Sequence, residues 1–85
     1  MEPQESMTSV KIRLFGFDGS SKVIDIAVHS NITVREIISN VIKMLNLKID
    51  NDEVLILCNG RQLYPDDVLP INCMELELFP LALGG

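Results

Sequence analysis

The 85-residue sequence predicts one α+β domain, in which a single helix covers one face of a mixed sheet of four to five strands. Three observations support this prediction. Apolar and polar residues alternate in several short runs, as in half-buried strands, and one segment among them has the period of an amphipathic helix. Asn59-Gly60 separates two of these runs and is a strong signal for a hairpin turn. The apolar fraction of 47% is sufficient for a core, and the length allows no second domain.

The first two strands are predicted over residues 10–17 and 22–28. Each run alternates, and the residues from Asp18 to Ser21 between them are turn formers. We therefore expect a hairpin with one side facing the core. The inward positions are Val10, Ile12, Leu14, Ile24, Ile26 and Val28.

A helix is predicted over residues 34–46. Thr33 and Glu36 have the spacing of a capping box, in which the hydroxyl accepts from the Glu36 N–H and the carboxylate reaches back to the Thr33 N–H. Many of the apolar positions are β-branched, which lowers helix propensity, so the helix depends on packing against the sheet. Its apolar stripe consists of Val34, Ile37, Ile38, Val41, Ile42 and Leu45.

The second half of the chain predicts three more strands after a polar loop. Pro65 and Pro70 disfavour regular pairing before the last strand, and Pro80 ends that strand. The strands are predicted over residues 54–58, 61–63 and 74–79. The chain is thus divided into a flexible N-terminal arm at 1–9, a folded domain at 10–79 and an extended tail at 80–85.

The net charge of −5 argues against nucleic acid or an anionic membrane as the main partner, because both select for clustered positive charge. No apolar run is long enough to span a membrane. Six basic and five acidic residues up to Ile49 give +1, whereas one basic and seven acidic residues from Asp50 onward give −6. The acidic half is interpreted either as a solubilising surface or as a face that attracts a basic partner near the C-terminus.

Four apolar residues fall on the outward parity of the predicted sheet, which the helix leaves uncovered. Scattered exposed apolar residues are ordinary, but several on adjoining strands form a patch that usually marks a contact surface. The expected partner-binding patch consists of Phe15, Leu55, Leu57 and Phe79.

The polar and sulfur-bearing side chains do not predict an enzyme. His29 is the only histidine and has no evident catalytic partner, and no metal site or bound cofactor is expected. Cys58 and Cys73 lack CxxC spacing. Two cysteines are too few for a disulfide framework, so we expect buried thiols and a cytoplasmic location, with a disulfide between them as the less favoured alternative.

At this point the sequence resembles a known family. The element order is similar to that of the β-grasp fold, and residues 10–85 resemble ubiquitin-like proteins. Residues 56–63, Ile-Leu-Cys-Asn-Gly-Arg-Gln-Leu, are similar to the ubiquitin segment in which a strand turns through Gly into a short strand. Residues 77–85, Glu-Leu-Phe-Pro-Leu-Ala-Leu-Gly-Gly, resemble the ends of the sulfur carriers MoaD and ThiS, of ubiquitin-related modifiers and of archaeal small modifier proteins.

The resemblance implies a protein modifier or sulfur carrier activated at the carboxylate of Gly85, next to Gly84. In such proteins an E1-like enzyme of the MoeB, ThiF or UBA type adenylates the terminal carboxylate with ATP and Mg, and sulfur then opens the acyl-adenylate. The product is a thiocarboxylate, which donates sulfur through sulfur-transfer enzymes, or a conjugate to lysines of target proteins, which can mark them for the proteasome. The resemblance further implies a monomer.

The same resemblance implies roles for the residues of the tail, and the sequence departs from ubiquitin at two places. Arg61 stands where ubiquitin has a chain-forming lysine, and Leu81 and Leu83 stand where its tail carries arginines. Ubiquitin-type chains through position 61 are therefore excluded. The residues expected in tail recognition are Pro80, Leu81, Ala82 and Leu83, and the possible acceptor lysines are Lys11, Lys22, Lys43 and Lys48.

The alternative is a ubiquitin-like interaction module whose Gly-Gly pair is never activated. The position of Gly85 as the last residue favours activation, because such modules usually lie within longer chains.

Overall fold

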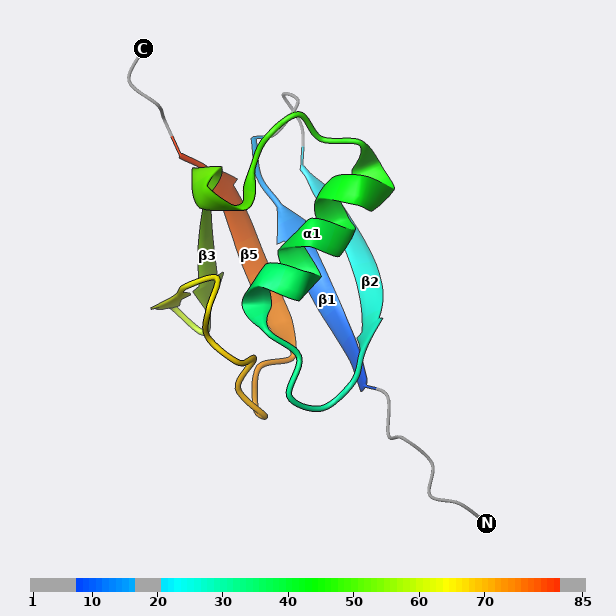
Figure 1. Ribbon diagram of the computed structural model, residues 1–85, viewed down its shortest axis with the longest axis vertical. Coiled ribbons are helices and arrows are strands. Elements are labelled where there is room, and N and C mark those ends of the chain that lie inside the picture. Colours follow the sequence, from blue (N-terminus) through cyan, green and yellow to red (C-terminus); the bar gives the residue numbers. More distant parts are fainter. Residues whose placement is uncertain (1–7, 17–20, 82–85) are drawn as a thin grey trace.

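In the computed structural model, which describes residues 8–16 and 21–81, five strands form one mixed sheet and one α-helix crosses one of its faces (Figure 1). The strand order is β2-β1-β5-β3-β4. The two central strands, β1 and β5, are parallel, and the other neighbours are antiparallel. The predicted α+β architecture is confirmed. The strands are β1 (Thr8–Leu14), β2 (Lys22–Val28), β3 (Val54–Cys58), β4 (Arg61–Leu63) and β5 (Glu75–Pro80).

The first hairpin has different ends from those predicted. β1 begins two residues early because Thr8 and Ser9 still pair with Val28 and Ala27. It ends at Leu14, and the chain then reaches Gly16 with a φ of 78°. The remainder of the predicted arm, the end of the predicted first strand with its turn, and most of the tail lie outside the described residues, at positions 1–7, 17–20 and 82–85.

The helix α1 (Val34–Leu45) begins where predicted and ends one residue earlier. The Thr33 hydroxyl accepts from the Glu36 N–H at 3.2 Å, which is one of the two hydrogen bonds of the predicted capping box, and among the described contacts the return bond from the Thr33 N–H to the Glu36 carboxylate is not formed. The Glu36 carboxylate lies 4.0 Å from Nε2 of His29. Asn46 ends the helix in the left-handed region, with a φ of 54°, and its N–H contacts the carbonyls of Ile42 and Lys43.

The core lies between α1 and the inner face of the sheet. Strand parity places apolar side chains inward throughout, and no polar or charged side chain is buried in the described part of the chain. The sequence pattern therefore predicted most of the core, whereas Ile24, Ile42 and Leu45 are only partly buried and pack against it. The largest fully buried side chains include Ile12 and Leu14 of β1, Leu76 and Leu78 of β5, Ile56 of β3, and Ile37 and Ile38 of α1.

The segment between β4 and β5 is irregular, as its prolines indicate, and it is attached to the start of α1. Three backbone hydrogen bonds join the two, namely Val34 N–H to Asp67 O at 2.8 Å, Arg35 N–H to Pro65 O at 2.9 Å and Leu69 N–H to Ile32 O at 2.9 Å. The preceding hairpin turn at Asn59 and Gly60 has positive φ at both residues, 54° and 80°, as the dipeptide predicts.

The loop after α1 is more ordered than predicted. It contains a single 3-10 turn, η1 (Asn51–Glu53), in which the Asp50 N–H donates to Oε1 of Glu53 at 3.0 Å. The Asn51 amide donates to Ser39 of α1 at 3.1 Å. This turn leads directly into β3 and lies beside the end of β5 (Figure 1).

The expectation of free thiols at Cys58 and Cys73 is wrong for this structure. Both residues are buried, as predicted, but they form a disulfide with Cα atoms 6.2 Å apart. The reason is topological. β3 and β5 are antiparallel neighbours, so the end of β3, where Cys58 lies, is close to the residues that precede β5. Spacing along the sequence does not show this proximity.

Candidate functional site

The last described residues leave the sheet at a defined point beside η1. Pro80 still pairs with Val54, and the Leu81 N–H donates to the carbonyl of Glu53 at 2.9 Å. Gly16 lies against Pro80, whose ring carbons are 3.8 Å from the position that a Cβ on Gly16 would take. Because β5 is parallel to β1, the chain exits at the end of the domain opposite to the start of β1 (Figure 1). We call this the tail end.

Leu81 is 41% exposed, so its side chain is accessible at the exit from the sheet. The other residues expected to take part in recognition or activation, Ala82, Leu83, Gly84 and Gly85, lie outside the described residues. Their roles remain predictions from the sequence.

The structure brings the four outward apolar residues together. The rings of Phe15 and Phe79 are stacked, with centroids 4.8 Å apart and planes 11° from parallel. Leu55 is opposite Phe79 in the β3–β5 register, and Leu57 is opposite Glu77. Phe15 lies just beyond β1, but its N–H donates to the Leu78 carbonyl at 3.0 Å.

The patch is half-buried, and charged residues border it. Arg13 forms an ion pair with Glu75 across β1 and β5, and it faces Glu77 in register. Lys11 is opposite Glu75, two residues before the Arg13 and Glu77 pair on the same strands. The outer face of the sheet is therefore a small apolar area beside alternating charges, and its role in binding a partner remains a prediction.

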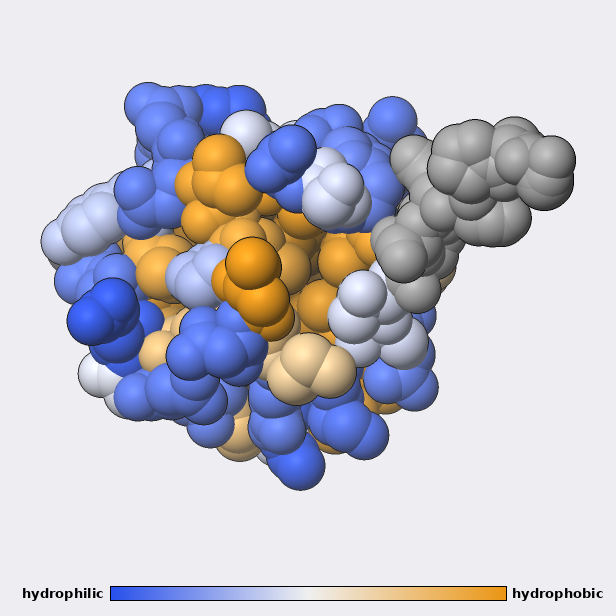
Figure 2. All heavy atoms as spheres, turned by 90° about the horizontal axis from the view of Figure 1, so that it is seen from below, coloured by the Kyte–Doolittle hydropathy of each residue, from blue (hydrophilic) through white to orange (hydrophobic). Residues whose placement is uncertain are grey.

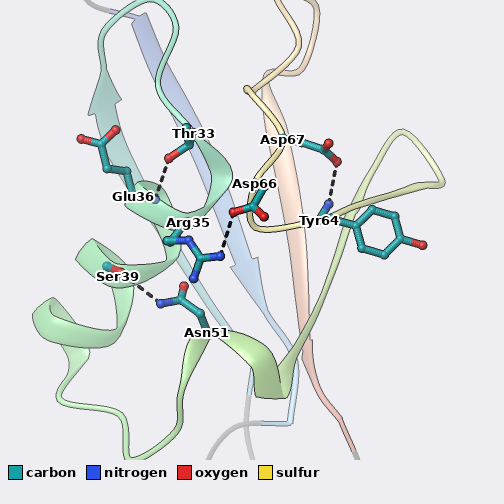
Figure 3. Close-up of polar contacts among 8 residues, drawn as sticks. All are labelled: Thr33, Arg35, Glu36, Ser39, Asn51, Tyr64, Asp66 and Asp67. Carbon is teal, nitrogen blue, oxygen red and sulfur yellow. Dashed lines mark hydrogen bonds and ion pairs between the residues drawn. The ribbon is translucent and has the colours of Figure 1, made fainter.

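The acidic residues of the second half do not form one face. Asp66 and Asp67 belong to the segment attached to the start of α1, where Asp66 accepts from Arg35 and Asp67 accepts from the Tyr64 N–H, each at 2.8 Å (Figure 3). Glu75 and Glu77 lie on the outer face of the sheet. The remaining three, Asp50, Asp52 and Glu53, are in or next to η1 and so lie beside the tail. The charge that the sequence assigns to one half is thus divided among three places.

The possible acceptor lysines Lys11, Lys22, Lys43 and Lys48 are all exposed. Arg61, in the position that departs from ubiquitin, is also exposed in β4. Accessibility therefore does not select one acceptor, and their use remains a prediction.

Two polar contacts were not anticipated from the sequence. The hydrogen bond to Asp66 and the charge of that carboxylate raise the pKa of Arg35, which favours the charged guanidinium. His29 has Nδ1 at 2.9 Å from the Ser30 carbonyl oxygen and Nε2 at 4.0 Å from the Glu36 carboxylate. The side chains of His29 and Glu36 are both exposed. Within the described residues no cluster of three or more His, Cys, Asp or Glu side chains is arranged to hold a metal ion.

Sequence comparison finds no matching family model and no matching curated protein. The structure is similar to "Caldiarchaeum Subterraneum Ubiquitin", with a TM-score of 0.72 and 21% identity over 94% of this chain and 100% of that one. The fold is the ubiquitin-like β-grasp. The N-terminal ubiquitin-like domain of the 4931431F19Rik protein is also similar, with a TM-score of 0.70 and 16% identity over 100% of this chain and 85% of that one.

The β-grasp likeness extends to a designed protein based on ubiquitin, with a TM-score of 0.58 and 22% identity over 89% of this chain and 93% of that one. These structures are ubiquitins and ubiquitin-like domains, so the likeness to sulfur carriers remains a prediction from the sequence. No helix in the described part of the chain is long and apolar enough to cross a membrane.

Proposed function

We propose that this protein is a cytoplasmic ubiquitin-like modifier, a sulfur carrier, or both, activated at the carboxylate of Gly85 by an E1-like enzyme. The observation that carries the proposal is the exit of the chain beside η1. β5 ends at Pro80, and the exposed Leu81 follows it four residues before Gly85, in a fold shared with ubiquitin.

The tail has the physical properties that such an activation requires. Residues 80–85 reach about 20 Å when extended, enough to enter an active site while the domain stays outside. Gly84 and Gly85 have no Cβ, so they fit a narrow channel and leave the terminal carbonyl open to attack. Alternate residues of an extended chain share one side, so we expect Leu81 and Leu83 to act together as apolar anchors for the enzyme.

The chemistry divides between this chain and its partner. The enzyme supplies ATP and Mg²⁺, the Gly85 carboxylate attacks the α-phosphate, and pyrophosphate leaves. Sulfide then displaces AMP to give a thiocarboxylate, or a cysteine thiolate displaces it to give a thioester. The thiocarboxylate supplies sulfur to a sulfur-transfer enzyme, and the thioester passes to a lysine of a target protein, which can direct that protein to the proteasome.

The outer face of the sheet provides the docking surface in this proposal. The stacked Phe15 and Phe79, with Leu55 and Leu57 beside them, present apolar area next to the strand that continues into the tail. An enzyme that contacts this patch therefore holds the tail at a fixed distance from the docked surface.

The test uses the full chain in a lysate of the source cells with ATP, and with sulfide added. The intact mass and the lysine remnants of other proteins are then measured. Exchange of one oxygen for sulfur supports a sulfur carrier, and C-terminal remnants on lysines support a modifier. A chain lacking Gly84 and Gly85 is the matched control and gives neither product. Unmodified full-length chain under all conditions contradicts the proposal.

A second candidate is a ubiquitin-like interaction module without activation. It is supported by the similarity to the N-terminal ubiquitin-like domain of the 4931431F19Rik protein. In this case a partner binds through the outer-face patch, so Phe79→Ala weakens binding and removal of Gly84 and Gly85 has no effect. If the chain is activated, removal of Gly84 and Gly85 should instead reduce product formation more than Phe79→Ala does.

A further inference from the structure

The disulfide attaches a short turn to the rest of the domain. Cys58 is the last residue of β3, and Cys73 lies two positions before the first residue of β5. Their side chains are buried, with 5% and 2% of each residue exposed. Residues 70–73, which we call the 70–73 turn, are closed by a hydrogen bond from the Cys73 N–H to the Pro70 carbonyl at 3.0 Å.

The neighbouring residues are held in another way. Residues 64–69 are bound to the start of α1 by backbone hydrogen bonds and by the Arg35–Asp66 ion pair. Met74, on the other side, accepts from the Lys11 N–H at 3.0 Å. Among the described residues, the disulfide is the one cross-link between the turn and the rest of the chain. No described hydrogen bond from a nitrogen or oxygen atom of the turn reaches outside it. The turn carries Ile71, which is 97% exposed.

The turn separates two cavities at the end of the domain opposite the tail, which we call the disulfide end. Figure 2 views this end and shows apolar residues gathered at its centre, with hydrophilic residues around them. The larger cavity, of about 290 Å³, is lined by apolar residues that include Val10, Val28, Ile32, Ile71 and Cys73. The smaller, of about 230 Å³, is lined by Cys58, Asn59, Arg61, Leu63, Pro70 and Asn72.

Each cysteine therefore lines one of the two cavities, although both residues are almost fully buried from solvent. A small thiol that enters either cavity therefore meets one of the two cysteines, whereas a folded protein is too large to enter. In the reduced state the Cys73 thiol has an acceptor in the Glu75 carbonyl, which lies 3.7 Å from its sulfur. Reduction thus leaves the Cys73 thiol beside a hydrogen-bond acceptor.

We propose that the Cys58–Cys73 disulfide is a thiol–disulfide exchange site for small thiols, and that its reduction releases the 70–73 turn from the wall of the apolar cavity. A thiolate attacks Sγ of Cys73, the S–S bond breaks, and Cys58 leaves as a thiolate. A second thiolate attacks the small-molecule sulfur of the mixed disulfide and releases Cys73. Two electrons pass from two thiols to the protein, the thiols leave as their own disulfide, and both cysteines take up protons.

We expect Arg61 to influence which sulfur leaves. It is opposite Cys58 in the β3–β4 register, and both residues line the smaller cavity. A cation beside a departing thiolate stabilises it and increases the rate of exchange. The arrangement therefore favours loss of Cys58 as the leaving group over loss of Cys73.

The experiment follows hydrogen exchange of the full chain in glutathione buffers of increasing reducing strength, with the thiol state measured by alkylation and mass. We expect one two-electron transition, accompanied by exchange about tenfold or more faster in residues 70–73, while β1 and α1 keep their protection. A Cys58→Ala/Cys73→Ala variant shows the faster exchange without any response to glutathione. Resistance to reduction, unchanged exchange in the turn, or loss of protection throughout the domain overturns the proposal.

A second measurement tests the exchange site apart from folding. Arg61→Gln slows reduction about two- to fivefold, because the departing thiolate loses its cation. Lys48→Gln, which removes the same charge from the exposed loop after α1, leaves the rate unchanged. Trapped mixed disulfide is expected on Cys73, and equal slowing in both variants or trapping on Cys58 contradicts the assigned direction. None of these readouts depends on activation at Gly85.

Discussion

The two ends of the domain differ in how firmly they hold the chain. At the tail end, Leu81 is attached by one backbone hydrogen bond to Glu53 and then leaves the sheet. At the disulfide end, the segment between β4 and β5 is held by backbone hydrogen bonds to α1, an ion pair and a covalent bond. One sheet thus presents a segment at one end and restrains a segment at the other. Stability and activation should therefore respond to different residues.

The largest expected effect is at the tail end. Gly84→Val adds a branched side chain next to the proposed reactive carboxylate and lowers the rate of adenylation by about 100-fold or more, because the carboxylate no longer reaches its attacking position. The free energy of unfolding should change by no more than about 0.5 kcal/mol. Pyrophosphate exchange with the activating enzyme and urea unfolding measure the two quantities.

Ile71→Ala at the disulfide end is the control, since this side chain is 97% exposed and far from the tail along the sheet. It should alter neither quantity. Normal adenylation of Gly84→Val contradicts the assignment of the tail, and a less stable Gly84→Val variant contradicts the separation of the two ends.

The next effect in size is at the disulfide end. Cys58→Ala/Cys73→Ala removes a link between residues 15 positions apart, which lowers the free energy of unfolding by about 3 kcal/mol. Adenylation of the folded variant should be unchanged. Urea unfolding measures the loss, and reduced wild-type protein should reach the same value. Equal stability of wild-type and variant contradicts a restraining role for the disulfide.

The sequence predicted the elements of both ends but not how each end is held. Strand parity determines which side chains are buried, so Ile12, Leu76 and the outward Phe79 could be placed from alternation alone. Which strand ends meet depends on the sheet order, and that order brings Cys58 and Cys73 together. Spacing and composition favoured free thiols because neither contains this information.

The charges show the same limit. Counting along the sequence put the negative charge in one half, whereas the fold places Asp66 beside Arg35 at the disulfide end and Asp52 beside the tail. The Asp-Asp pair after Pro65 lies in a turn, where Asp67 accepts from the Tyr64 N–H. Its contact with α1 could not be inferred, because that contact joins residues 31 positions apart.

A smaller effect is expected at the start of α1, which holds the disulfide end. Thr33→Ala removes the acceptor for the Glu36 N–H and should lower the free energy of unfolding by about 1 kcal/mol. Thr33→Ser retains the hydroxyl and should lose much less. Urea unfolding compares the two variants, and equal losses would show that the methyl group, not the cap, carries the effect.

The smallest effect concerns the acidic residues beside the tail. Asp50→Asn/Asp52→Asn removes two exposed charges next to η1 and should slow association with the activating enzyme about two- to fivefold at low ionic strength, if that enzyme presents a basic surface there. The difference should vanish near 1 M salt, where the screening length falls to about 3 Å. Asp25→Asn/Glu36→Gln removes the same charge elsewhere and should have little effect. Equal slowing by both pairs would mean that net charge, and not the acidic residues at the tail end, attracts the partner. A slower rate that persists at high salt would instead indicate a direct contact at η1, and the tail end would then bind its partner through this turn as well as through the tail.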